Sequence, residues 1–472
     1  MNADTEAVWL DEGHITASLD AHKVEDAALV AETLAKAEEL HGLNADDAAA
    51  LLAVKDPELR EQIFHAAARV KERIYGRRVV LFAPLYFSSL CGNECLYCAF
   101  RSRNTEVRRR ALSMQEIDAE TRILLRQGHK RLLLVAGEAY PGSGIDYVLD
   151  TIDTVYAARE DGASIRRVNV NLAPLSVEDF RRLGERHIGT FQLFQETYHR
   201  PTYARVHLAG PKRNFDWRAS CFDRAMLAGI DDVGMGLLYG LYDWRFETLA
   251  LLSHIGHLEE RFGVGCHTIS VPRMEPAAGS EMAMCPPHPL GDDDFLLLIA
   301  VLRLAVPYTG IILSTRENAS LRQQALELGV SQISAGSRTS PGGYAETADE
   351  DSDNTDFDAA QFRRGDCRNL EEVVADLAER GYIPSFCTGC YRKGRTGKDF
   401  MDLARPGLIS RKCTPNALST FEEYLLDYAS PATRALGESA IARCLEDMDD
   451  KVRKTSERLL HDVRAGQRDV YC

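Results

Sequence analysis

Three cysteines at one point of the chain are spaced to hold a reactive iron–sulfur cluster. Cys91, Cys95 and Cys98 form a Cys-x3-Cys-x2-Cys pattern within PLYFSSLCGNECLYCAFR. Three thiolates can bind three irons of a cubane cluster and leave the fourth iron open to another ligand. A structural zinc site would need a fourth protein ligand, and the neighbouring sequence offers none at a suitable spacing. A zinc loop and three incidental buried cysteines remain the alternatives.

A second set of three cysteines lies near the C-terminus. Cys387, Cys390 and Cys413 form Cys-x2-Cys-x22-Cys. A second cluster with one open iron fits this set, although a remote His or Cys could complete a zinc site instead. Two open-iron sites in one chain indicate two reactions, or one reaction whose product is passed to a metal. The six remaining cysteines are unclustered, and we expect most to be small buried hydrophobic residues.

The elements that must position these cysteines form a repeating pattern. From about Arg77, short β-rich runs alternate with amphipathic helical stretches, which is typical of a parallel sheet built from βα units. Eight such units predict an α/β fold, a TIM-type (β/α)8 barrel with the first cysteine loop at the carboxyl end of its first strand. The predicted strands are Val79–Tyr86, Arg131–Ala136, Arg167–Leu172, Thr190–Phe194, Asp232–Leu237, His267–Val271, Ile311–Ser314 and Gln332–Ala335.

The rest of the chain divides around this barrel. Residues 1–75 read as an N-terminal helical extension, and the barrel spans 76–340. An acidic segment at 341–369, which contains ETADEDSDNTDFD, has too little apolar surface to fold alone and predicts a mobile loop. Residues 370–472 predict a C-terminal, mostly helical domain that binds the second cluster.

Composition and charge narrow the function further. The formal net charge of −15 argues against binding to a phosphate backbone, so we expect no nucleic-acid partner. No run of about 18 apolar residues could span a bilayer, and the acidic N-terminus lacks the pattern of a secretory signal. The sequence therefore predicts a soluble, cytoplasmic protein with no membrane partner and with small-molecule chemistry.

The first cysteine loop, with the aromatic Tyr97 before its third cysteine, resembles the radical S-adenosylmethionine (SAM) superfamily. The resemblance implies that a [4Fe–4S] cluster binds SAM, and that an electron from a reducing donor cleaves SAM to a 5′-deoxyadenosyl radical. It also implies a role for Gly137 and Glu138, which end the second predicted strand where the family binds the ammonium of SAM. A carboxylate facing an ammonium is favourable chemistry.

Four further residues are candidate cofactor contacts. Asn169 and Asn171 alternate in the third predicted strand, so both side chains point the same way, either toward a ribose or carboxylate or into the packed barrel interior. Glu196 ends the fourth strand. Arg273 follows the sixth, in CHTISVPR.

The whole pattern, from about residue 75 to the C-terminus, resembles the HydG family of tyrosine lyases that mature [FeFe]-hydrogenase. Its segments include RRVNVNLA, LFQETYHRPTY and CTGCYRKGRTG. The resemblance implies cleavage of the Cα–Cβ bond of L-tyrosine to p-cresol and dehydroglycine. Dehydroglycine then yields carbon monoxide and cyanide at the C-terminal cluster, supplying an iron–carbonyl–cyanide unit to hydrogenase maturation proteins.

The same resemblance implies that the C-terminal site holds a [4Fe–4S] cluster with an additional iron and a bound cysteine, and that His267 helps to hold the extra iron. Substrate contacts follow from charge. Arg316, beside Ser314 and Thr315 at the end of the seventh predicted strand, is placed to bind an amino-acid carboxylate with two parallel hydrogen bonds.

Three other functions stay open. The 2-iminoacetate synthases of thiamine biosynthesis share the barrel and the tyrosine cleavage but lack the C-terminal triad. A radical lyase acting on tryptophan would be equally well served by Arg316. A non-catalytic iron–sulfur scaffold or electron carrier would be expected to keep its clusters fully ligated, usually by four cysteines.

Overall fold

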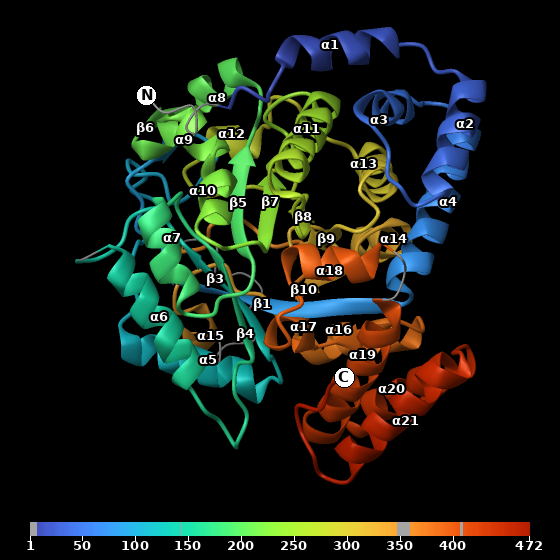
Figure 1. Cartoon of the computed structure of the whole chain (residues 1–472). Coiled ribbons are helices and arrows are strands. Elements are labelled where there is room, and N and C mark those ends of the chain that lie inside the picture. The colour runs from blue at the N-terminus through green and yellow to red at the C-terminus, as the bar shows by residue number, and fades with distance from the viewer. Residues whose placement is uncertain (1–6, 143, 347–358, 406–408) are drawn as a thin grey trace.

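A closed parallel barrel forms the centre of the molecule in the computed structural model, which describes residues 7–142, 144–346, 359–405 and 409–472 (Figure 1). Each strand pairs in parallel with the next, and β10 returns to β1 through pairs such as Val80 with Gln332. The eight predicted strands are all present, so the barrel prediction is confirmed. They are β1 (Arg78–Ser88), β3 (Arg131–Ala136), β4 (Arg167–Asn171), β5 (Phe191–Glu196), β7 (Val233–Leu237), β8 (Thr268–Ser270), β9 (Gly310–Leu313) and β10 (Gln332–Ser334).

Helices between the strands cover the outside of the barrel. Several begin at residues that cap the free backbone N–H groups of a first turn; Ser113 and Glu116, for example, form a reciprocal capping box. The main connecting helices are α5 (Met114–Arg126), α6 (Ile145–Ala157), α7 (Val177–Gly184), α10 (Cys221–Leu227), α11 (Trp244–Phe262), α13 (Asp292–Ala305) and α14 (Ala319–Leu328).

The chain before the barrel is helical, with α1 (Glu12–Ala21), α2 (Ala27–Glu38), α3 (Ala45–Leu52) and α4 (Pro57–Tyr75). Helix α4 begins with Pro57 after the capping Asp56 and packs on α13 and α14. Its buried face, which includes Ile63 and Val70, joins the same core as the barrel helices. The extension is therefore part of the barrel's outer layer.

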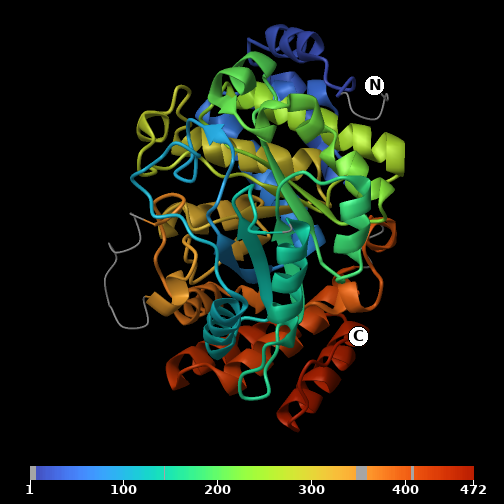
Figure 2. The ribbon, with the colours of Figure 1, turned by 90° about the vertical axis from the view of Figure 1, so that its left-hand side faces the viewer.

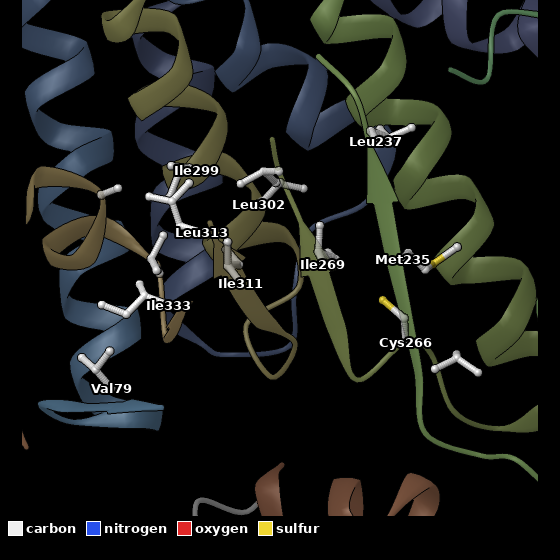
Figure 3. Close-up of a cluster of buried hydrophobic side chains, with 14 of the residues drawn as sticks. Val79, Met235, Leu237, Cys266, Ile269, Ile299, Leu302, Ile311, Leu313 and Ile333 are labelled. Carbon is white, nitrogen blue, oxygen red and sulfur yellow. The ribbon is translucent and has the colours of Figure 1, made fainter. Parts of the chain in front are cut away.

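The hydrophobic core lies between the strands and this helical layer. Figure 3 shows Ile269 and Ile311 on neighbouring strands with Ile299 and Leu302 of α13 over them. All four side chains are buried. Alternate residues of each strand face outward into this core, which leaves the other half to line the interior of the barrel.

The C-terminal region adds a strand as well as helices. Strand β11 (Ile383–Ser385) pairs in parallel with the start of β1, with Arg78 opposite Ile383. Strand β3 pairs with β1 only from Ala83 onward, so this early part of β1 has a free edge that β11 occupies. A region predicted as mostly helical thus contributes a strand to the main sheet, and Cys387 follows it directly.

Helices of the C-terminal region cover the amino end of the barrel, away from α1 in both views (Figures 1 and 2). They are α16 (Leu370–Glu379), α17 (Gly389–Arg392), α18 (Gly397–Ala404), α19 (Ser410–Asp427), α20 (Pro431–Glu446) and α21 (Asp450–Arg464). Of the predicted acidic loop at 341–369, residues 347–358 lie outside the described residues, and α15 (Gly343–Glu346) is a short helix at its start. Within the described ranges, no helix is long and apolar enough to cross a bilayer.

Candidate active sites at the two ends of the barrel

The first cavity opens at the carboxyl end of the strands and has a volume of about 190 Å³. The loop after β1 brings Cys91, Cys95 and Cys98 to its wall. Most of the predicted cofactor and substrate residues line the same space. These are Tyr97, Gly137, Glu138, Asn171, Glu196, Ser314, Thr315 and Arg316.

A short antiparallel ribbon fixes the cysteine loop. Strand β2 (Glu94–Cys95) pairs with β6 (His207–Ala209), which sets Cys95 opposite His207. The Tyr97 hydroxyl lies 2.8 Å from Nε2 of His207. Burial raises the pKa of Cys95 and Cys98, the latter to about 11, so these thiols ionise only with a compensating cation such as iron.

Glu138 sits at the centre of a buried ionic network. Its carboxylate accepts hydrogen bonds from Arg218 Nη1 and from Asn93 Nδ2, each at 2.8 Å. Burial opposes ionisation of Glu138, but Arg218 and then Lys212 outweigh it and hold the pKa below its usual value. The carboxylate is thus ionised and fixed next to the cysteine loop.

Lys212 links this network to Glu196, with 2.6 Å between Nζ and Oε1. Glu196 has a φ of 72°, a left-handed conformation that a non-glycine residue adopts at a cost of about 1–3 kcal/mol. Gly137, which directly precedes Glu138, has to be a glycine, because a Cβ there would lie 2.2 Å from the carbonyl oxygen of Leu90. The sequence analysis missed Lys212 and Arg218, since HLAGPKRNFDWRAS carries no recognisable motif.

Arg316 enters the same cavity as an unpaired cation. Its guanidinium carbon lies 3.4 Å from the centre of the Phe362 ring, and burial lowers its pKa against the opposing effect of Tyr86. Among the described residues no carboxylate lies within ion-pair distance of it. The arrangement suits a carboxylate ligand that arrives from solution.

Two predicted cofactor residues do not line this cavity. Asn169 lies deeper in the barrel, where its Oδ1 accepts a hydrogen bond from the backbone N–H of Thr190 at 3.0 Å. Arg273 donates from Nε to Glu317 at 3.0 Å and from Nη1 to Asp292 at 2.7 Å. Asn169 therefore forms its hydrogen bond within the packed interior of the barrel. Arg273 belongs to an ionic cluster beside the cavity.

The second cavity lies at the amino end of the barrel and has a volume of about 80 Å³. Cys387, Cys390 and Cys413 all line it, and so does His267, which immediately precedes β8. Strand β11 leads into Cys387, and α19 carries Cys413. Four residues from distant parts of the sequence, all predicted to hold metal, are therefore brought to one space.

Arginines surround the second triad. Arg131 Nη2 donates to the carbonyl oxygen of Cys387 at 2.7 Å, and Arg78 lies beside Cys413. A hydrogen bond from the Cys390 thiol lowers the pKa of Cys413, burial opposes the shift, and Arg78 adds to it. A positively charged surrounding favours thiolates, the form in which cysteine binds iron.

One carboxylate in the second cavity has no hydrogen-bond partner. Asp232 is 3% exposed, and neither of its oxygens is satisfied in the structure. Nearby, Nε of both Arg131 and Arg167 is also unsatisfied, and Arg167 stacks 3.5 Å over the ring of Tyr391. Buried charges without partners cost free energy, so this cavity is suited to a polar ligand or ordered water.

Neither triad is arranged around a single ion. Within the described ranges, no three His, Cys, Asp or Glu side chains are placed to hold one metal ion. Two sets of three cysteines with further polar groups facing a cavity do fit a polynuclear cluster with an open iron.

The fold and the first cysteine loop together define a radical SAM enzyme. The Radical SAM superfamily model matches residues 85–252, and the Biotin and Thiamin Synthesis associated domain model matches residues 270–383. Such an enzyme uses a [4Fe–4S] cluster, SAM and an electron donor. A near full-length match to a solved structure at 46% identity defines the chain further: it belongs to the family of the [FeFe]-hydrogenase maturase HydG.

A crystal structure of HydG, a maturase of the [FeFe]-hydrogenase, superimposes with a TM-score of 0.94 at 46% identity and covers 99% of this chain and 100% of that one. HydG from Carboxydothermus hydrogenoformans gives a TM-score of 0.81 at 38% identity, covering 95% and 97%. The 2-iminoacetate synthase of Escherichia coli (strain K12) is 33% identical over 343 residues, which is 72% of this chain and 86% of that protein.

Proposed function

We propose that this protein cleaves L-tyrosine to p-cresol and dehydroglycine at the carboxyl end of the barrel, and converts dehydroglycine to carbon monoxide and cyanide at the amino end. The product would be an iron–carbonyl–cyanide unit for [FeFe]-hydrogenase assembly. The observation that carries the proposal is the joining of Cys387, Cys390, Cys413 and His267 at one cavity. The near full-length similarity to HydG supports it.

At the first site, Cys91, Cys95 and Cys98 would hold a [4Fe–4S] cluster, which together with SAM supplies a 5′-deoxyadenosyl radical. Glu138, kept ionised by Arg218 and Lys212, would accept the ammonium group of SAM. Its rigid network positions that carboxylate before any ligand binds.

Arg316 would bind the tyrosine carboxylate from the other side of the cavity. The hydroxyl groups of Ser314 and Thr315 would add hydrogen bonds at the same strand end. Phe362 stacks on the Arg316 guanidinium and fixes its plane, which favours two parallel bonds to a carboxylate. Glycine-sized fragments and intact tyrosine can share this contact because both carry the same carboxylate.

At the second site, the cysteine triad would hold a second cluster with an additional iron near His267 and a bound cysteine. The positive charges of the surrounding arginines would offset the negative charges of the thiolates. Asp232 offers an acceptor for an N–H group, and Arg131 offers a donor for a carboxylate. Both polar ends of a small imino acid would therefore have partners here.

A second candidate function is that of a 2-iminoacetate synthase, which the 33% identity over 86% of the E. coli enzyme favours. The first cavity would serve both activities equally. The two functions differ at the amino end, because a 2-iminoacetate synthase would release its product intact.

An anaerobic assay separates the candidates. The reconstituted protein is incubated with dithionite, SAM and L-tyrosine, and 5′-deoxyadenosine, p-cresol, cyanide and carbon monoxide are measured together. All four products support the maturase function. Deoxyadenosine and p-cresol without carbon monoxide, even with added iron and cysteine, would indicate a 2-iminoacetate synthase, and no deoxyadenosine would contradict both. Hydrogenase maturation proteins as partners and a cytoplasmic location follow from the same proposal.

A further inference from the structure

Two segments of an acidic chain are rich in basic residues. Residues 99–112 contain five arginines and one glutamate, and residues 200–213 contain three arginines, one lysine and no acidic residue. The formal net charge of the whole chain is −15. Two short basic segments on such a background create a local potential that attracts acidic macromolecules.

The fold brings these two segments together over the first cysteine loop. The backbone N–H of Arg103 donates to Glu94 at 2.8 Å, and Glu94 pairs with Ala209 in the β2–β6 ribbon. Helix α8 (Arg200–Val206) and the 3-10 turn η2 (Pro211–Arg213) contact β6 on either side. Figure 1 shows β6 with α8 and α9 (Phe215–Ala219) at the end of the molecule opposite α21.

Three arginines on this face are free to meet a partner. Arg103, Arg205 and Arg213 are exposed, and within the described chain no hydrogen bond or ion pair holds their guanidinium groups. Of the other basic residues, Arg200 pairs with Asp216 and Arg101 with Glu94, whereas Arg108 is also exposed. We call Arg103, Arg205, Arg213 and the neighbouring Leu208 the arginine face.

An exposed apolar side chain lies within the arginine face. Leu208 is 46% exposed, although it lies in a strand. Met284, at the end of α12 (Glu281–Met284), is 59% exposed, and the capping Ser280 of that helix donates to the carbonyl oxygen of Leu96 at 2.6 Å. Apolar residues inside a charged rim are typical of protein interfaces.

The arginine face is also close to the candidate cluster. His207 pairs with Cys95 across the ribbon, and Leu208 is the next residue. Paired residues in an antiparallel ladder have Cα atoms about 5 Å apart, so the exposed Leu208 backbone lies within roughly 9 Å of that of Cys95. A protein bound here would stand over the cysteine loop.

We propose that the arginine face is the docking surface for an acidic one-electron carrier protein that reduces the first cluster. The carrier loses one electron and the cluster held by Cys91, Cys95 and Cys98 gains it, and no bond is made or broken. The proposal rests on the assignment of those cysteines as ligands. A nucleic acid would also be attracted by the arginines, but Leu208 and Met284 favour a protein surface.

The test uses a charge-reversal variant and a matched control. The first carries Arg103→Glu, Arg205→Glu and Arg213→Glu. The control carries Lys451→Glu, Lys454→Glu and Arg458→Glu on α21, three exposed residues at the opposite end of the molecule. Both variants change the net charge equally, so an effect of total charge alone would appear in both.

The first measurement is binding of an acidic bacterial ferredoxin to the full-length protein by calorimetry, from 50 mM to 1 M salt. We expect the charge-reversal variant to bind at least tenfold more weakly at low salt, with the difference vanishing near 1 M, where the Debye length is about 3 Å. The control variant should bind like the wild type. Unchanged binding, or equal weakening in both variants, overturns the proposal.

The second measurement is 5′-deoxyadenosine formation with either dithionite or reduced ferredoxin. We expect the charge-reversal variant to match the wild type with dithionite and to lose most of its rate with ferredoxin. Loss of the dithionite rate with ferredoxin binding intact overturns the proposal, because the arginines would then serve the cysteine loop itself. The proposal is also overturned if the charge-reversal variant loses binding of single-stranded DNA but keeps binding of ferredoxin. A wild type that binds ferredoxin at this face but never forms p-cresol would contradict the proposed function and not the docking surface.

Discussion

The two ends of the barrel differ in how their charges are balanced. At the carboxyl end, Glu138 and Glu196 are already paired with Arg218 and Lys212 before any ligand binds. At the amino end, Asp232 and its neighbouring arginines leave polar atoms unsatisfied. The first site is therefore pre-organised by the chain alone, whereas the second requires a ligand or water to complete its hydrogen bonds.

The largest effects should come from the cysteines themselves. Cys95→Ala should abolish 5′-deoxyadenosine, p-cresol and carbon monoxide together, because the later products depend on the first site. Cys387→Ala with Cys390→Ala should keep p-cresol and lose carbon monoxide. Product analysis by chromatography and a haemoglobin assay for carbon monoxide checks both. Loss of p-cresol in the double variant would mean that the two ends do not act separately.

Asp232→Asn should reduce carbon monoxide and cyanide formed per p-cresol by about 10- to 100-fold, since a hydrogen bond to a charged group contributes about 1.5–3 kcal/mol. The p-cresol rate itself should stay near the wild-type value. Asp231→Asn is the control, because Asp231 faces Thr396 instead of lining the cavity. Equal behaviour of the two variants would remove Asp232 from the second site.

Arg316→Gln should lower kcat/KM for tyrosine by about 10-fold or more, for the same loss of a charged hydrogen bond. Every product should fall in proportion, so the ratio of carbon monoxide to p-cresol stays constant. Arg273→Gln is the comparison variant, because Arg273 is bound to Glu317 and Asp292. It should lower the melting temperature and leave KM for tyrosine almost unchanged. A changed product ratio in Arg316→Gln would mean that Arg316 also acts on the second reaction.

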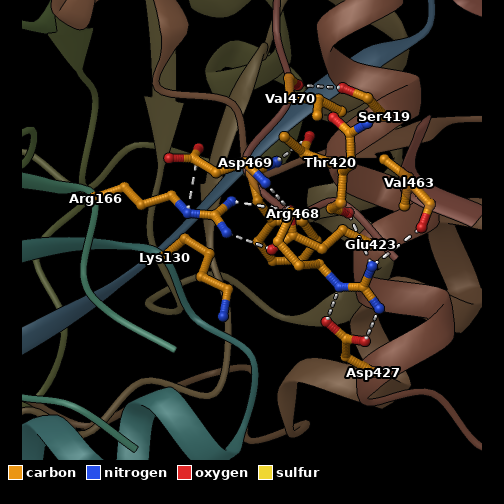
Figure 4. Close-up of polar contacts among 12 residues, drawn as sticks. Lys130, Arg166, Ser419, Thr420, Glu423, Asp427, Val463, Arg468, Asp469 and Val470 are labelled. Carbon is orange, nitrogen blue, oxygen red and sulfur yellow. Dashed lines mark hydrogen bonds and ion pairs between the residues drawn. The ribbon is translucent and has the colours of Figure 1, made fainter. Parts of the chain in front are cut away.

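The smallest effect on chemistry should come from the contact that holds the C-terminal helices to the barrel. Arg166 donates to both oxygens of Glu423 on α19, which also accepts from the backbone N–H of Asp469 at 2.9 Å (Figure 4). Glu423→Gln leaves Arg166 partly uncompensated and should destabilise the protein by about 1–3 kcal/mol. Hydrogen exchange should show faster opening of α19 and not of β3, and carbon monoxide yield should fall only a few-fold.

Much of the barrel could be predicted from the sequence because its signals are local. Each strand is a short apolar run, and the cysteine pattern that predicts the first cluster, from Cys91 to Cys98, lies within eight residues. The second cavity is different. Arg78, Asp232 and His267 come together there only because of the order in which the strands lie in the barrel. A single sequence does not show that order.

What the sequence did not reveal has physical causes too. Strand β11 has only three residues, Ile383–Ser385, and its partner is an edge about 300 positions earlier in the chain, so its local pattern is too short to identify it. Asn169 and Asn171 do share a strand face, but the cavity begins only at Asn171. An alternating pattern shows which face of a strand a residue lies on, but not how far along the barrel axis it lies. Lys212 and Arg218 act only through carboxylates that the fold brings to them.

The pairing of β11 with β1 has a consequence for the order in which the protein is made. The barrel can close once β10 has left the ribosome at Ser334, while the second triad is complete only at Cys413. Those remaining residues, about 80, take roughly 4–16 s at a synthesis rate of about 5–20 residues per second. The loop that carries Cys91, Cys95 and Cys98 is thus in place on the barrel before the second triad is complete. The two cysteine sites of one chain are therefore completed at different times as well as in different places.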